Sequence, residues 1–312
     1  MTVDVIIPVY KPGEKLIQII KRLHRQTVKL NKLILINTEK RYFDEFFADR
    51  TILNEYDDIV IEHISSEEFN HGATRRMGVD MSEADYFVCM TDDAVPLDDM
   101  LLEQLISPLE KGIAAAVYAR QCASKKCSDI ERFTRKFNYP DESRLKSKRD
   151  ISRLGIKTYF CSNVCAAYNR DIYEKLGGFV NSTIFNEDMI YAASVIKAGY
   201  SVYYNANAKV EHYHVYSNMQ QMRRNFDLGV SQAEHPEVFK DVPSEGEGTK
   251  MVKQTAQYLA TKHEYAKIVS LVITSGFKYL GYQLGKHYKL LPDFIIKKLT
   301  MNKMYWKQMK RK

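Results

Sequence analysis

The chain has 312 residues, of which 45% are hydrophobic, and it carries a formal net charge of +7. This apolar content is enough for a sizeable core and excludes a disordered chain. The five cysteines are odd in number and lack the tight spacing of a zinc knuckle, which argues against a disulfide framework and a metal-binding finger. The apolar run at 268–277 is too short to cross a membrane, and residues 1–4 enter a strand rather than a secretory leader, so we expect a cytoplasmic protein.

Two segments have a marked excess of positive charge. Residues 122–157 contain eleven Lys or Arg against five Asp or Glu, and residues 286–312 contain nine against one. This separation predicts two basic surfaces, for which a solvated face, a phosphate-bearing substrate and an anionic membrane are all open interpretations. Because no nucleic-acid-binding motif accompanies the charge, we expect no nucleic-acid partner.

The N-terminal half alternates between predicted strands and helices. Residues 3–10 form an apolar run typical of a strand, residues 11–13 predict a turn, and apolar residues at helical spacing then lead to a second strand at 32–36. The pattern continues with helices at 44–53 and 73–81, and with strands at 59–64, 86–90, 114–119, 158–167 and 201–210. Strands separated by helices predict a mostly parallel sheet with right-handed crossovers.

A turn-rich segment divides the chain. Residues 241–248 combine Pro, Ser and Gly and predict a linker, after which helical periodicity continues to the end. We therefore expect a main domain over residues 1–240 and a helical C-terminal region over residues 241–312. In that region, residues 295–299 and 304–307 mix basic and apolar side chains, which is typical of helices at a membrane surface or of helices that pack against the protein.

Asp92 and Asp93 directly follow the strand predicted at 86–90. In an open α/β sheet, ligands bind just beyond the carboxyl ends of the strands. Two carboxylates at that point suit a divalent cation such as Mg²⁺ or Mn²⁺. A plain turn before Pro96 is the structural alternative.

A second acidic position lies at Asn186-Glu187-Asp188, before apolar residues at helical spacing. Asn186 is predicted to cap this helix, which places Asp188 in its first turn. The helix dipole favours the ionised carboxylate there, so Asp188 can accept a proton at neutral pH or simply complement the dipole.

Two further groups extend the pattern. His212 and His214 follow the strand predicted at 201–210 and share one face of an extended chain, either as metal ligands or as ordinary surface side chains. Gly72 precedes the helix at 73–81, whose first backbone N–H groups and Arg75 or Arg76 suit a phosphate, although an arginine at a helix start is often simply solvated.

Taken in this order, the motifs resemble family 2 of the GT-A glycosyltransferases over about residues 1–240. The resemblance rests on Ile6-Ile7-Pro8-Val9-Tyr10, Gly72 to Gly78, Thr91-Asp92-Asp93, Gly177-Gly178-Phe179, and Asn186-Glu187-Asp188 with the histidines that follow. Within the family, residues 69–76 and 91–96 are most similar to bacterial rhamnosyltransferases that build cell-wall or O-antigen polysaccharides. The resemblance implies a Rossmann-like α/β fold of the GT-A type, with a nucleotide-sugar half over residues 1–120 and an acceptor half over residues 121–240.

The resemblance also assigns roles to individual residues. Asp93 matches the metal-binding position of the family's D-x-D motif, with Asp92 beside it, and His212 matches an additional metal ligand, with His214 as the second choice. The cation, Mn²⁺ or Mg²⁺, would bridge the diphosphate of a nucleotide sugar. The donor site is assigned Pro8, Tyr10, Asn37, Gly72 and Arg75, and the acceptor side is assigned Asn163 and Glu187.

Asp188 resembles the family's catalytic base, which takes a proton from the acceptor hydroxyl during a single inverting displacement. Asn37 departs from the family, which commonly has an acidic residue at this position to read the base. Its side-chain carbonyl can still accept a hydrogen bond from N3–H of thymine or uracil, which leaves dTDP and UDP both open. The adjacent Asp92 and Asp93 also differ from a spaced D-x-D motif.

The implied activity is a metal-dependent transfer of L-rhamnose from dTDP-β-L-rhamnose to a lipid-linked, rhamnose-containing cell-wall polysaccharide, with formation of an α-L-rhamnosyl linkage. Two alternatives are a UDP-hexose donor on the same fold and a catalytically silent relative that binds polysaccharide or partner enzymes. The basic segments suit an anionic membrane surface, so we expect a peripheral protein on the inner face of the bacterial plasma membrane. The helical C-terminal region is expected to associate with that membrane or to form a homodimer.

Overall fold

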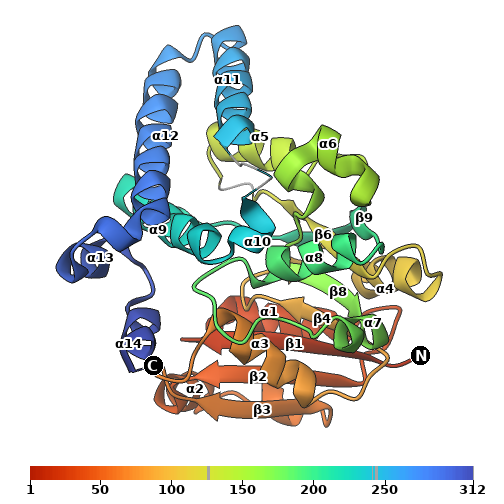
Figure 1. The fold of residues 1–312 in the computed structure, drawn as a ribbon. Helices are drawn as coiled ribbons and strands as arrows, with labels where there is room; N and C mark the ends of the chain where they lie inside the picture. The colour runs from red at the N-terminus through yellow and green to blue at the C-terminus, as the bar shows by residue number, and fades with distance from the viewer. Residues whose placement is uncertain (125–126, 241, 243–244, 312) are drawn as a thin grey trace.

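The computed structural model describes residues 1–124, 127–240, 242 and 245–311. Over these residues the chain forms a nine-stranded sheet in the order β3-β2-β1-β4-β8-β6-β9-β5, with β7 paired to β9. Helices cover both faces of the sheet, and the predicted α/β class is confirmed (Figure 1). No helix in the described part of the chain combines the length and the apolar character that a membrane crossing requires.

The first four strands form a parallel half-sheet, as predicted. Its strands are β1 (Val3–Tyr10), β2 (Lys32–Thr38), β3 (Ile59–Ile64) and β4 (Tyr86–Met90). Its helices are α1 (Glu14–Leu23), α2 (Lys40–Phe47), the short η1 (Ile52–Asn54) and α3 (His71–Asp80). The prediction of a helix at 44–53 is wrong in its bounds, because Phe43 and Phe47 supply the buried face of α2 and the chain turns after them.

The second half of the sheet is mixed. Its strands are β5 (Val95–Pro96), β6 (Ala116–Cys122), β7 (Arg144–Lys146), β8 (Cys165–Asn169) and β9 (Val202–Glu211). β8 runs antiparallel to β4 and β6, whereas β6 and β9 are parallel. The strand predicted at 158–167 is wrong at its start, because Thr158 ends a 3₁₀ turn, η3 (Gly155–Thr158), and β8 begins only at Cys165. The start of β8 therefore lies at the same edge of the sheet as the carboxyl ends of β1, β4, β6 and β9.

Side chains of the central strands alternate between two apolar cores, one on each face of the sheet. In β1, Val5 and Ile7 pack into one core and Ile6 into the other. The helices that cover these cores or connect the strands are α4 (Leu101–Glu110), α5 (Asp129–Asn138), η2 (Lys148–Asp150), α6 (Ile151–Leu154), α7 (Arg170–Lys175), α8 (Glu187–Lys197) and α10 (Pro236–Phe239). The five cysteines are free thiols, in agreement with the prediction against disulfides.

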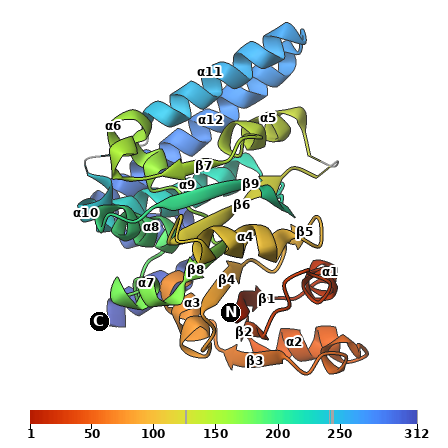
Figure 2. The same cartoon turned by 90° about the vertical axis from the view of Figure 1, so that its right-hand side faces the viewer.

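The C-terminal region is helical, as predicted. Its helices are α11 (Glu245–Thr261), α12 (Tyr265–Lys286), η4 (Tyr288–Leu290), α13 (Asp293–Leu299) and α14 (Lys303–Arg311), and they follow α9 (Asn218–Glu234). Figure 1 and Figure 2 show α11 and α12 as a hairpin that projects beyond the sheet. Of the linker predicted at 241–248, residues 245–248 belong to α11, and residues 241, 243 and 244 lie outside the described residues.

The two last helices pack against the protein. Ile296 of α13 and Tyr305 of α14 are buried in a third apolar core together with residues of α9. Asp227 of α9 accepts hydrogen bonds from Thr300 Oγ1 at 2.6 Å and from the Met301 N–H at 2.9 Å. Of the two interpretations of residues 295–299 and 304–307, the structure therefore favours packing over exposure at a membrane.

Helices α9 and α12 approach so closely that glycine is required between them. A Cβ atom at Gly281 would lie 2.1 Å from the carbonyl oxygen of Met222, whereas one at Gly276 on the same helix would meet nothing within 4 Å. We expect Gly281→Ala to lower the free energy of unfolding by about 1–3 kcal/mol, because the helices must separate. Gly276→Ala, the matched control, should raise it by up to about 1 kcal/mol through helix propensity. Urea unfolding of both variants checks this, and equal stabilities would contradict the close packing.

Candidate active site

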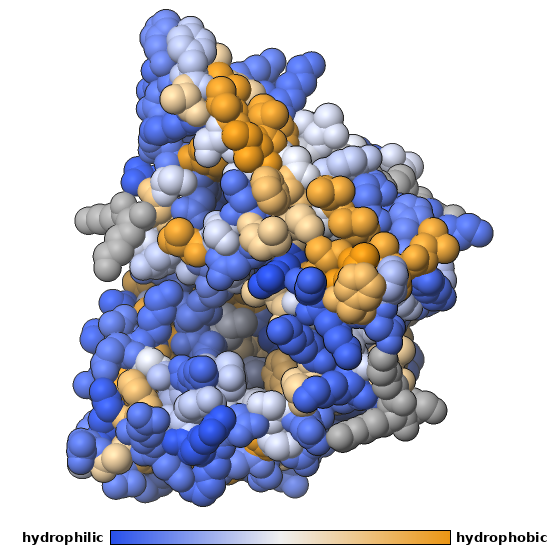
Figure 3. Space-filling view, turned by 90° about the vertical axis from the view of Figure 1, so that its left-hand side faces the viewer, coloured by the Kyte–Doolittle hydropathy of each residue, from blue (hydrophilic) through white to orange (hydrophobic). Residues whose placement is uncertain are grey.

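Polar side chains from several strands meet at one edge of the sheet. Asp93 follows β4, His212 follows β9, and Asn163 lies just before β8. The N–H of Thr91 donates to the carbonyl of Val164 at 3.2 Å, which holds the end of β4 beside the start of β8. Figure 3 views the side of the molecule toward which β1 and β2 point in Figure 1, and it shows a hollow there. The hollow lies where an open α/β sheet is expected to bind its ligand.

Asp93, His212 and His214 form a compact cluster. Their ligand atoms all lie within 4.8 Å of one another. His212 Nε2 is 3.4 Å from one carboxylate oxygen of Asp93, His214 Nε2 is 3.4 Å from the other, and the two imidazole nitrogens are 3.1 Å apart. The structure thus brings together the residue predicted to bind the metal and both histidines considered as its partner.

Gln121 of β6, which sequence reasoning missed, contacts His212 on the side away from the cluster. Arg135 of α5 can only donate, and it contacts Oε1 of Gln121, so the amide oxygen is the atom that faces His212. His212 Nδ1 lies 3.0 Å from that oxygen, which favours the tautomer with the hydrogen on Nδ1, and 3.4 Å from the guanidinium of Arg135. The lone pair of His212 is then on Nε2, which points into the cluster, as in metal sites where an outer partner orients the ligand. A polar residue at the end of an apolar strand was the available signal for Gln121.

The donor set of the cluster fits a divalent metal. Burial lowers the pKa of His212 well below its usual value, and Arg135 and His214 lower it further, so its imidazole is neutral and free to bind. His212 Nε2 and His214 Nε2, which lie 3.1 Å apart beside the Asp93 carboxylate, are donor atoms that a divalent cation accepts. Two imidazoles favour Mn²⁺ over Mg²⁺, because Mg²⁺ prefers an all-oxygen shell.

Asp92 is held away from the cluster. Its Oδ2 accepts a hydrogen bond from the backbone N–H of Tyr10 at 3.3 Å. Burial raises the pKa of Asp92 to about 6, opposed by the Tyr10 N–H and reinforced by the charge of Asp93. Lys15 of α1, another residue that sequence reasoning missed, lies 3.9 Å from Asp93 through Nζ and adds a positive charge to this edge.

Asp188 and Glu187 form the second part of the site, at the start of α8. Asp188 Oδ2 accepts a hydrogen bond from the Asn163 N–H at 2.8 Å, and Oδ1 accepts one from the Met189 N–H at 2.8 Å. The Asn163 side chain donates to Glu187 Oε1 at 3.1 Å. Because Asn163 precedes β8, these bonds fix both carboxylates at the edge that carries the metal cluster.

The electrostatics of Asp188 differ from the sequence expectation. Burial raises its pKa to about 7, and the neighbouring charge of Glu187 raises it further. The sequence predicts that the helix dipole favours the ionised carboxylate, but desolvation outweighs the dipole here. Asn186 does precede the helix but does not cap it: its backbone is left-handed and its side chain donates to Ser231 Oγ. A pKa near neutrality suits a general base that works near pH 7.

Glu187 is balanced by a buried cation. Arg75 of α3 lies 3.1 Å from its carboxylate, and both side chains are less than a tenth exposed. Burial would raise the pKa of Glu187, but Arg75, His71 and Asn163 outweigh it, so the pKa lies below its usual value. Arg75 also donates to the carbonyl of His71. The guanidinium predicted to bind phosphate thus has partners within the protein.

The N–H of Gly72 likewise has a partner within the protein. It donates to Asn70 Oδ1 at 3.1 Å, and a Cβ atom at this position would lie 2.0 Å from the carbonyl oxygen of Val180. The phosphate-binding roles of Gly72 and Arg75 stay predictions that these contacts do not favour. Both residues instead join α3 to the segment that leads into α8.

The remaining donor-site residues lie on β1 and β2. Pro8 is half-buried in β1, and Tyr10 is exposed at its end with its ring 5.8 Å from that of Tyr42. Asn37 is fully buried; its Nδ2 lies 2.9 Å from His63 Nδ1, and its Oδ1 has no partner among the described residues. This unpaired carbonyl oxygen is the acceptor that the predicted contact with a pyrimidine requires, and the contact stays a prediction.

Comparisons with known proteins agree with the fold. Residues 4–177 match the model of Glycosyl transferase family 2. The chain is 37% identical over 98% of its length to the O-antigen chain rhamnosyltransferase RfbN of Salmonella typhimurium, of which it covers 96%. It is 38% identical over 96% of its length to the O-antigen chain rhamnosyltransferase WbaN of Salmonella anatum, of which it covers 94%.

Two solved structures share the fold at low identity. The mannosyltransferase PcManGT from Pyrobaculum calidifontis, in complex with GDP-Man and Mn²⁺, has a TM-score of 0.59 and 13% identity, over 92% of this chain and 86% of that one. TarS of S. aureus, residues 1–349, has a TM-score of 0.53 and 11% identity, over 93% of this chain and 91% of that one. The chain belongs to glycosyl transferase family 2, and it is a glycosyltransferase with the GT-A fold that is similar to O-antigen chain rhamnosyltransferases.

Proposed function

We propose that this protein is an inverting, Mn²⁺-dependent transferase that moves L-rhamnose from dTDP-β-L-rhamnose to a lipid-linked polysaccharide and forms an α-L-rhamnosyl linkage. The observation that carries the proposal is the joint placement, at one sheet edge, of the Asp93, His212 and His214 cluster and of Asp188. The rhamnosyltransferase names of the two relatives support the sugar. The Mn²⁺ complex of the mannosyltransferase with the same fold supports the cation.

The residues of this chain have separable roles in the proposed reaction. Asp93, His212 and His214 would hold the cation, which would supply positive charge to the departing nucleoside diphosphate. Asp188 takes the proton of the acceptor hydroxyl as its oxygen attacks the anomeric carbon from the face opposite the diphosphate. One displacement from that face inverts the anomeric centre. Asn163 positions Asp188 through its backbone N–H.

The donor can be tested with a panel of nucleotide sugars. We expect donor hydrolysis and transfer to be fastest with dTDP-L-rhamnose, because the relatives are rhamnosyltransferases. Faster turnover of a UDP-hexose would show that the donor is a UDP-hexose, and the assignment as a glycosyltransferase would remain. No turnover of any donor with Mn²⁺ and a lipid-linked acceptor would favour a silent, polysaccharide-binding relative, which the assembled cluster and base argue against.

The proposed lipid-linked acceptor requires access to a membrane surface. An exposed apolar stripe runs along α12 at helical spacing, and Figure 3 shows hydrophobic side chains gathered over this helix. Its members are Tyr265, Val269, Val272, Ile273, Tyr279 and Leu280. We infer that this stripe, rather than the packed helices α13 and α14, contacts the lipid surface.

We expect the double variant Val272→Ser and Ile273→Ser to lose binding to vesicles that contain anionic lipid, because both side chains are about half exposed and apolar. Co-sedimentation with the vesicles measures the bound fraction. Ile113→Ser, which removes an equally exposed apolar side chain outside the C-terminal region, is the matched control and should bind as the unaltered protein does. The stripe would instead belong to a homodimer interface if the double variant still sediments with the vesicles but is monomeric where the unaltered protein is a dimer.

A further inference from the structure

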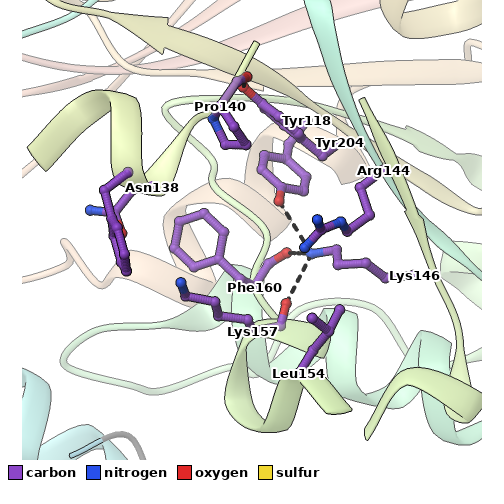
Figure 4. Close-up of a pocket in the computed structure, with 10 residues that line it drawn as sticks. Tyr118, Asn138, Pro140, Arg144, Lys146, Leu154, Lys157, Phe160 and Tyr204 are labelled. Carbon is purple, nitrogen blue, oxygen red and sulfur yellow. Dashed lines mark hydrogen bonds between the residues drawn. The ribbon is translucent and has the colours of Figure 1, made fainter. Parts of the chain in front are cut away.

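A second pocket lies away from the metal cluster, in the basic segment whose role the proposed reaction leaves open. Figure 4 shows it between β7, the end of α5 and the turn η3, with a cavity of about 100 Å³. Its lining residues are Tyr118, Phe137, Asn138, Pro140, Arg144, Lys146, Leu154, Lys157, Phe160 and Tyr204. The lining thus combines aromatic rings with three cations and contains no carboxylate.

Lys146 brings a buried charge without a counter-ion. The residue is 3% exposed, and its Nζ donates to the Tyr118 hydroxyl at 3.3 Å and to the carbonyls of Lys157 and Phe160. All three acceptors are neutral, so the positive charge has no anion beside it among the described residues. Burial lowers the pKa of Lys146 to about 7, opposed by Cys161 and Asp150 and reinforced by the charge of Arg144. A buried ammonium beside a second cation is costly unless an anion joins them.

Arg144 stands at the exposed side of the same pocket. Its side chain has no hydrogen bond or ion pair among the described residues, and in Figure 4 it extends toward the same region beside Tyr118 as Lys146 does. Lys157 differs, because it pairs with Glu247 of α11 and lies 4.2 Å above the ring of Phe137. Arg144 and Lys146 are therefore the two lining cations that have no carboxylate partner among the described residues, and the three N–H donors of Lys146 are held by neutral oxygens, so Lys146 offers its positive charge rather than a free donor.

We propose that this pocket binds the carboxylate or phosphate group of an acidic carbohydrate between Arg144 and Lys146, with the sugar ring against the surrounding aromatic side chains. The cavity is well below the several hundred Å³ of whole small-molecule sites, so it admits the charged group and leaves the ring at the mouth. Aromatic rings offer the apolar faces of a sugar a flat surface, and guanidinium pairs with a carboxylate or phosphate through two parallel hydrogen bonds. The site does not depend on the proposed transfer reaction.

The test is isothermal titration calorimetry of the full chain with glucuronate, glucose 1-phosphate and glucose. We expect the two anionic sugars to bind and neutral glucose not to bind. The tighter of the two anionic sugars identifies a carboxylate or a phosphate as the preferred group. Arg144→Gln and Lys146→Met should each weaken binding at least about tenfold, because each removes a positive charge that faces the anion.

Matched controls separate this site from general charge and from the metal cluster. Lys148→Met and Arg149→Gln remove neighbouring exposed cations that do not line the pocket, and they should bind as the unaltered protein does. Asp93→Asn should also keep the affinity, whatever its effect on sugar transfer. Arg144 is exposed, so its variant keeps the fold even if Lys146→Met does not. Undiminished binding by Arg144→Gln, or no binding of either anionic sugar at millimolar concentration, would overturn the proposal.

Discussion

Replacing Asp188 with Asn is expected to slow sugar transfer on the order of 10²–10⁴-fold while leaving nucleotide binding unchanged. The amide keeps the size of the side chain, and its oxygen can still accept one of the hydrogen bonds that Asn163 and Met189 donate to the carboxylate. It cannot take a proton from the acceptor hydroxyl. The measurement is single-turnover transfer of labelled sugar, with nucleotide binding followed by calorimetry on the same protein.

The pH dependence of transfer provides a second readout of the same role. Because the pKa of Asp188 is raised to about 7, its carboxylate is the minor form below that pH, and the rate should rise as the pH increases through about 7. The residual rate of Asp188→Asn should lack this rise. Asp80→Asn, an exposed substitution of the same type, is the control and should retain both the rate and the profile. Transfer by Asp188→Asn at the unaltered rate would remove Asp188 as the base.

Residues at strand ends were predictable because the geometry of a sheet brings those ends together. The apolar run at 86–90 marks the end of β4, and the strand predicted at 201–210 nearly matches β9, so Asp93 and His212 could be placed at one edge from sequence alone. The pairing register of the strands then brings in a residue that the sequence pattern does not indicate. Strand β6 sets Gln121 beside His212, and no spacing along the chain connects those two residues.

Partners that depend on tertiary packing could not be predicted. Arg75 precedes Glu187 by more than a hundred residues, and only the docking of α3 against the segment before α8 buries the two side chains together. That burial also reverses the expected behaviour of Asp188, because the sequence shows the helix start but not the desolvation. The same holds for the C-terminal region, in which the amphipathic residues of α13 face α9 and the exposed apolar stripe lies on α12 instead.

Replacing Asp93 with Asn is expected to abolish Mn²⁺-dependent transfer and to weaken Mn²⁺ binding more than the roughly 10–100-fold that loss of an outer partner costs. The carboxylate is the one anionic member of the cluster, and it faces both imidazoles at 3.4 Å. Gln121→Leu should weaken Mn²⁺ binding by only about 10–100-fold, because it removes the outer partner that orients the His212 imidazole. Electron paramagnetic resonance of free Mn²⁺ during titration measures both affinities, with the exposed Asp49→Asn as the control.

Comparing His212→Gln with His214→Gln in the same titration shows which imidazoles bind the cation. His212 is buried and oriented by Gln121, whereas His214 is exposed and stacks on Tyr216. The loss of affinity should therefore be larger for His212→Gln, because an oriented ligand pays less conformational entropy on binding. A loss in both variants means that both histidines are ligands, as their 3.1 Å separation favours. Unchanged Mn²⁺ binding in both would contradict a metal site formed by this cluster, and transfer that proceeds without a divalent cation would remove the metal from the mechanism.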